Sequence, residues 1–212
     1  MSSPEVPRIA RWALIPAVAA PVALIGGWTL AAALRPERFD PVTQTISALA
    51  ARGEPNRWVM TTALVVVGVS YLGTAVALRP AAPVGRLVLA VGGLATIGVA
   101  ALPLPQVAAA VQHAGSAPES DPASAAHAAA AGAAFVALAV WPALAWRPGA
   151  PAPVLTARAG AAASAVLLCL VGWFAVELSE EGQQVGLTER LAAGAQALWP
   201  LAPVVASLRR RC

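Results

Sequence analysis

The chain has 212 residues, of which 58% are hydrophobic and 11% are charged, and its mean hydropathy is +0.70. Because soluble domains carry about 25% charged residues, this composition excludes a water-soluble globular protein. Every basic residue is an arginine, which also excludes chemistry that needs a lysine nucleophile.

Six nearly charge-free stretches follow one another along the chain, and each can cross a bilayer as a helix of about 20 residues. They cover approximately residues 12–34, 57–78, 84–104, 124–146, 156–178 and 188–208. Transmembrane strands alternate polar and apolar residues, which these stretches do not, so each is predicted to be an α-helix. The predicted fold class is therefore all-α, a single polytopic membrane domain over residues 1–212 built as a six-transmembrane-helix bundle.

The charged residues in the gaps divide between the two sides of this six-span topology. One side collects the arginines Arg8, Arg11, Arg79, Arg86, Arg147, Arg158, Arg209, Arg210 and Arg211. The other side collects nearly all the carboxylates, namely Glu37, Asp40, Glu54, Glu119, Asp121, Glu177, Glu180, Glu181 and Glu189. The positive-inside rule then predicts a plasma (inner) membrane protein with cytoplasmic N- and C-termini. Since topology explains the net charge of +4, we expect no nucleic-acid partner.

The first loop on the acidic side, residues 35–56, has the pattern of a short amphipathic helix. Asp40 followed by proline is a helix-start signal, and Val42, Ile46 and Leu49 recur at helical spacing. Such a helix is predicted to lie in the outer interface or against the bundle. Two simpler readings stay open: Asp40 as a plain N-cap, and Ser47 as a small packing residue. The polar face of the helix carries Thr43, Gln44 and Ser47.

Histidine occurs twice, and His127 at the start of the fourth span is the more informative position. A histidine at membrane depth is expected to face the bundle or a wet cavity, where it can transfer protons. The alternative is a structural hydrogen bond to a neighbouring helix. His113 lies in the second outer loop, and the two histidines lack the close spacing of a zinc site. We therefore expect no metal and no cofactor.

The sixth span opens with two adjacent charges, Glu189 and Arg190. Glu189 is favourably placed near a helix N-terminus. Arg190 departs from the charge pattern because it is basic at the acidic boundary, which makes it the best candidate for an ion pair or an anion clamp. Gln196, deeper in the same span, is predicted to form an interhelical hydrogen bond. Ser47, His127, Asp40 and Glu189 together supply a nucleophile, a base and acids, but no GxSxG motif supports a hydrolase.

Three segments carry a family resemblance: FDPVTQTISALAARGEPNRWVMTTALVVVGVSYLGTA, His127 opening the fourth span, and GLTERLAAGAQALWPL. Together they resemble the domain-of-unknown-function family 998 of six-span prokaryotic membrane proteins, over nearly the whole chain. The resemblance implies a fold and a membrane location but no activity. The family pattern picks out Asp40, Ser47, Arg57, Trp58, Met60, His127, Glu189, Arg190 and Trp199.

The first functional hypothesis is a binding or processing site for a lipid or small amphiphile at the outer leaflet. In it, Arg190 holds an anionic head group beside His127, Ser47 and Gln44. The main alternative is a non-catalytic membrane scaffold or assembly partner, in which the outer motifs only lock the loops. A transporter and an intramembrane hydrolase are less favoured, since charged residues are missing from the middle of every span. The sequence leaves enzymatic activity and oligomeric state open.

Overall fold

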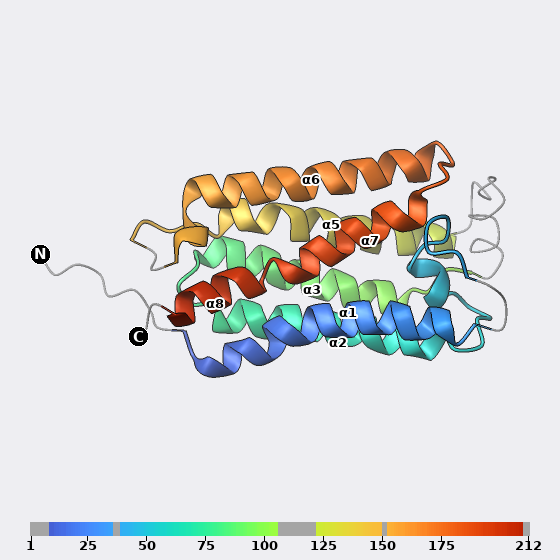
Figure 1. The fold of residues 1–212 in the computed structure, drawn as a ribbon, viewed down its shortest axis with the longest axis horizontal. Coiled ribbons are helices and arrows are strands. Elements are labelled where there is room, and N and C mark those ends of the chain that lie inside the picture. The colour runs from blue at the N-terminus through green and yellow to red at the C-terminus, as the bar shows by residue number, and fades with distance from the viewer. Residues whose placement is uncertain (1–8, 36–38, 106–121, 150–151, 210–212) are drawn as a thin grey trace, which may run out of the picture.

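A computed structural model describes residues 9–35, 39–105, 122–149 and 152–209 of the chain. In this part, six helical spans run side by side along one elongated bundle, and the first and last described residues lie at the same end of it (Figure 1). Several residues of the sequence analysis lie outside the described residues: Arg8, Glu37, His113, Glu119, Asp121, Arg210 and Arg211.

The prediction of an all-helical six-span protein is confirmed for the described residues. The helices are α1 (Leu14–Ala33), α2 (Arg57–Ala77), α3 (Pro83–Ala101), α5 (Pro122–Leu144), α6 (Ala157–Ser179), α7 (Val185–Leu198) and α8 (Leu201–Arg209). Three short 3₁₀ helices join them: η1 (Arg11–Ala13), η2 (Ser47–Ala50) and η3 (Pro153–Leu155). The helix boundaries lie within a few residues of the predicted ones.

The sixth span is the one that departs from a single continuous helix. It breaks into α7 and α8 at Trp199 and Pro200. Proline has no backbone N–H to donate to the carbonyl four residues back, and its ring clashes with that carbonyl, which interrupts the helical ladder. The two helices together still form one span, Val185–Arg209.

The helices pack in chain order, and the ring closes where α7 returns to α1. Small residues allow close crossings, as where α2 meets α3. A Cβ atom on Gly68 would lie 2.6 Å from the carbonyl oxygen of Gly93, so neither position has room for a side chain. Such close approach is how membrane helices gain packing energy without a hydrophobic driving force between them.

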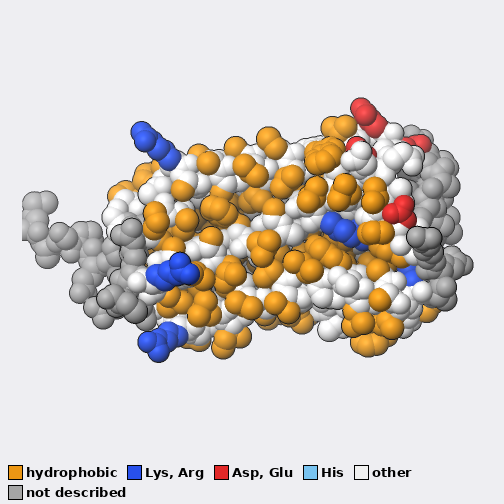
Figure 2. Space-filling model, in the orientation of Figure 1, with side chains coloured by type: hydrophobic (Ala, Val, Ile, Leu, Met, Phe, Trp, Pro, Cys, Tyr) orange, Lys and Arg blue, Asp and Glu red, His pale blue; other side chains and the backbone are white. Residues whose placement is uncertain are grey.

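Charge is segregated between the two ends of the bundle. Basic side chains gather at the end where α1 begins and α8 ends, here called the basic end, and acidic side chains lie at the opposite, acidic end (Figure 2). Apolar side chains cover the surface between them, as a bilayer requires. The acidic end also holds Arg35, Arg52 and Arg57, so Arg190 is less exceptional there than its place in the sequence suggested.

The helix predicted in the first loop is present only as the four-residue 3₁₀ helix η2, which is shorter than expected and begins later. Ahead of it, Asp40 caps a turn rather than a helix, since its carboxylate accepts from the Val42 amide at 2.9 Å and the Thr43 hydroxyl at 2.9 Å. The carbonyl oxygens of Pro41, Val42 and Gln44 bond to residues of α7 instead of to their own segment. Two of the three predicted apolar positions, Ile46 and Leu49, are buried against the bundle, whereas Val42 is exposed.

Candidate functional site

The first loop is clamped onto the start of α7, and Arg190 makes most of the clamp. Its Nη1 lies 2.9 Å from the carbonyl oxygen of Pro41, 2.8 Å from that of Gln44 and 2.8 Å from that of Gly186. The guanidinium also lies over two aromatic rings, with its Cζ atom 5.2 Å from the Phe39 centroid and 6.0 Å from the Trp28 centroid. Cation–π contacts of this kind add to the hydrogen bonds. Arg190 thus joins α1, the loop and α7.

Backbone contacts bring the loop still closer to α7. The Leu187 amide donates to the Val42 carbonyl oxygen at 3.0 Å. Gly186 lies against the loop backbone, where a Cβ atom would come within 2.2 Å of the Gln44 carbonyl oxygen. Only glycine permits this approach. The loop therefore rests on the helix through main-chain atoms.

Glu189 completes the attachment from inside the bundle. It is 4% exposed, and its two carboxylate oxygens accept from the Ile46 amide and, at 3.2 Å, from the Ser47 hydroxyl. These donors belong to the start of η2, so Glu189 caps that short helix across a large sequence separation. The helix N-terminus favours a carboxylate at this position, both through its free N–H groups and through its dipole.

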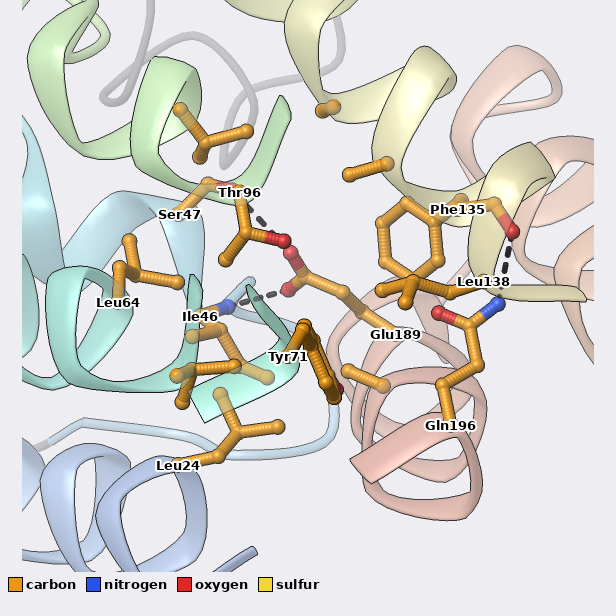
Figure 3. Close-up of a pocket in the computed structure, with 15 residues that line it drawn as sticks. Leu24, Ile46, Ser47, Leu64, Tyr71, Thr96, Phe135, Leu138, Glu189 and Gln196 are labelled. Atoms are coloured by element: carbon orange, nitrogen blue, oxygen red, sulfur yellow. Dashed lines mark hydrogen bonds between the residues drawn. The ribbon is translucent and has the colours of Figure 1, made fainter. Parts of the chain in front are cut away.

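Glu189 and Ser47 also line a cavity of about 70 Å³ inside the bundle (Figure 3). A cavity needs about 10–15 Å³ to hold one water molecule, so this one has room for several waters or a short apolar group. Most of its wall is apolar. The described lining comprises Leu24, Ile46, Ser47, Leu64, Val67, Tyr71, Thr96, Val99, Ala131, Ala134, Phe135, Leu138, Glu189, Ala193 and Gln196.

Of the predicted site residues, Ser47 and Glu189 meet at this cavity, whereas Gln44 lies beside it in the loop. The Gln44 side chain accepts a hydrogen bond from Arg35 at 3.0 Å. Arg35 in turn forms a salt bridge of 2.6 Å with Glu54. Gln44 therefore helps to hold the loop through both its side chain and its carbonyl oxygen. Asp40 is exposed, and its carboxylate accepts hydrogen bonds from Val42 and Thr43 in the turn that it caps.

His127 has a different environment. It is buried in α5, and its Nδ1 lies 2.7 Å from the carbonyl oxygen of Leu102, the residue that ends α3. This matches the structural hydrogen bond that the sequence analysis left open. Among the described residues, His127 is not part of the cavity lining, and no hydrogen bond joins it to Ser47. The serine–histidine contact of a catalytic triad is absent from this arrangement.

Sequence reasoning missed three contributors to the site. Tyr71 and Thr96 place polar groups on the cavity wall, and Gly186 makes the loop contact possible. A partial signal existed for Tyr71, because it follows Leu64 and Val67 at helical spacing along one buried face of α2. Gln196 was predicted to bond between helices, and it does so by donating to the Phe135 carbonyl oxygen at 2.8 Å.

Comparisons with known proteins bear on the whole chain. No match was found among curated proteins or among solved structures. One family, described as "Protein of unknown function (DUF998)", matches residues 17–206, a range that includes every residue of the clamp and the cavity. The resemblance predicted from the first loop, His127 and the start of the sixth span is therefore confirmed, and the chain belongs to the DUF998 family.

Proposed function

We propose that this protein binds a lipid or small amphiphile at the outer leaflet of the plasma membrane, in the cavity lined by Glu189 and Ser47. The observation that carries the proposal is the cavity itself, about 70 Å³ in volume with mostly apolar walls and a fully buried carboxylate. Small-molecule sites are typically apolar pockets with a few polar groups that fix orientation. An ionisable residue inside a membrane span is by default a functional candidate.

The depth of the cavity supports the outer-leaflet assignment. Leu64 and Glu189 lie within about two turns of the helix ends that face the first loop, while Leu24 and Leu138 reach deeper. The acidic end is the outer one by the positive-inside rule. A bound amphiphile would place its polar group near Glu189 and its apolar part toward Leu24 and Leu138.

In this proposal Arg190 has a different role from the anion clamp that the sequence suggested. Its Nη1 is engaged by three carbonyl oxygens, and Arg190 is not among the described residues that line the cavity. It fixes the loop that contributes Ile46 and Ser47 to the wall. A ligand would meet the carboxylate rather than the guanidinium.

A cavity-filling variant tests the proposal with a matched control on the same helix. Ala134 lines the cavity, and its neighbour Ala133 is exposed on the outer face of α5. Ala134→Leu should block the cavity and abolish retention of a small amphiphile in native mass spectrometry, whereas Ala133→Leu should retain it like the unaltered protein. Equal retention by all three proteins would overturn the proposal.

A scaffold role remains the second candidate, because the clamp itself is structural. Arg190, Gly186 and Glu189 hold the loop in place with no ligand required. Under this alternative, filling the cavity with Ala134→Leu leaves assembly with the partner intact, whereas loosening the loop with Arg190→Ala prevents that assembly. Affinity purification of the two variants, each with its bound partners, distinguishes the candidates.

A further inference from the structure

Two hydroxyl groups at the polar side of the cavity, those of Ser47 and Thr96, already donate their protons to acceptors within the protein. The Ser47 hydroxyl donates to Glu189 at 3.2 Å, and the Thr96 hydroxyl donates to the Gly92 carbonyl oxygen at 2.8 Å. A hydroxyl has one proton and two lone pairs. Ser47 and Thr96 therefore offer acceptors, rather than donors, to anything that enters the cavity.

The side-chain amide of Gln196 likewise presents an acceptor, rather than a donor, to the cavity. Its Nε2 donates to the Phe135 carbonyl oxygen at 2.8 Å, which fixes the amide and directs its oxygen the other way, toward the interior of the cavity (Figure 3). The hydroxyl of Tyr71 can either donate or accept. The polar wall is thus dominated by oxygen acceptors.

Glu189 adds the strongest acceptor to this set. Both of its oxygens accept hydrogen bonds from protein donors, as an ionised carboxylate does. A carboxylate offers about four lone-pair sites, so two donors leave capacity for a third or fourth. The salt bridge found within the described residues joins Arg35 to Glu54 and leaves Glu189 out. The neighbouring Arg190 lies outside the cavity lining.

From this lining we infer the ligand class: a primary ammonium group on an apolar chain, with the ammonium bound by Glu189. The inference rests on the proposed function and names its ligand. An ammonium group supplies three donors and no acceptor, which complements the wall. A buried carboxylate is costly unless it is paired, so a cation reaching it from the cavity gains an interaction that an alcohol cannot replace. A carboxylate head group would meet mostly acceptors and a like charge.

Three probes of equal chain length test the inference: hexylammonium, hexan-1-ol and hexanoate. The protein is placed in phosphatidylcholine nanodiscs, because that head group has no N–H donor, and binding is measured by ligand-observed NMR against empty discs. We expect hexylammonium to bind about tenfold more tightly than hexan-1-ol, as a hydrogen bond to a charged group implies, and hexanoate to bind least. Phosphatidylethanolamine added to the discs should compete if the natural ligand is a lipid, and a free amine is indicated if it does not.

Variants connect the ranking to the carboxylate. Glu189→Gln should remove the difference between hexylammonium and hexan-1-ol, while Glu180→Gln, at an exposed position of the same end, should preserve it. Equal affinity of the unaltered protein for all three probes overturns the inference but leaves the proposed function standing. Binding of none of them, or binding unaffected by Ala134→Leu, overturns the proposed function as well. The relative affinities of the three probes are measured on the unaltered protein, so they test the inferred ligand class even where Glu189→Gln fails to fold.

Discussion

Gly186 and Gln44 meet through their backbones, so closely that a Cβ atom on Gly186 would lie 2.2 Å from the Gln44 carbonyl oxygen and 2.8 Å from its nitrogen. The obstructing atoms are main chain, which cannot swing aside as a flexible side chain does. The first loop can therefore lie this close to the sixth span because residue 186 is a glycine.

Replacing Gly186 with alanine should push the loop off α7. We expect Gly186→Ala to lower the free energy of unfolding by about 1–3 kcal/mol, the usual cost of overpacking a close contact. The measurement is thermal unfolding in detergent, with Gly172→Ala as the control, because a Cβ atom at Gly172 meets no other atom within 4 Å. The control should be neutral or more stable, since alanine is the better helix former. Equal loss in both variants would contradict the close approach.

Arg190→Ala should free the first loop. It leaves the carbonyl oxygens of Pro41 and Gln44 without the cationic donor, and a hydrogen bond to a charged group contributes about 1.5–3 kcal/mol. We expect faster hydrogen exchange at the amides of residues 42–47. Arg190→Lys should restore part of the protection, because an ammonium can reach fewer acceptors in that geometry. Arg158→Ala, at an exposed position of the basic end, is the control. Unchanged exchange in Arg190→Ala would show that the loop is held by other contacts.

His127→Ala should destabilise the bundle without affecting the cavity. The variant loses the contact between Nδ1 and the Leu102 carbonyl oxygen, which ties the start of α5 to the end of α3. The expected cost is about 0.5–1.5 kcal/mol, the net contribution of one hydrogen bond. Thermal unfolding measures the loss, and hexan-1-ol binding serves as the second measurement. Loss of alcohol binding at full stability would instead place His127 in the ligand site.

The orientation of the chain follows from its charge and can be tested directly. Arg79, Arg86, Arg147 and Arg158 lie at the basic end, where α1 begins and α8 ends. The positive-inside rule predicts that this end faces the cytoplasm. Green fluorescent protein fused after residue 212 should fluoresce, and alkaline phosphatase fused after Gly182 should be active. An active phosphatase at the C-terminus would reverse the topology and move the cavity to the inner leaflet.

Much of the architecture could be read from the sequence because the bilayer leaves few choices. An apolar stretch of membrane length must be helical to satisfy its own backbone, and the six spans were placed within a few residues for that reason. Glu189 and Arg190 drew attention for the same reason, as charges at the boundary of an apolar span. Pro200 could have predicted the break between α7 and α8, since proline interrupts a helix, but the sequence analysis treated the sixth span as one continuous helix.

The loop and the site depended on contacts between residues far apart in the chain. The pattern from Asp40 to Leu49 favoured a helix, but the carbonyl oxygens of Val42 and Gln44 bond to Leu187 and Arg190, which no local rule anticipates. The partners of Ser47 and His127 were likewise undecided until the helices were packed, and only then did Ser47 join Glu189 and His127 join Leu102. Hydropathy alone determined the spans, since each helix satisfies itself within the membrane. Tertiary packing decided which polar groups meet, because each buried polar group must find its partner on another helix or loop.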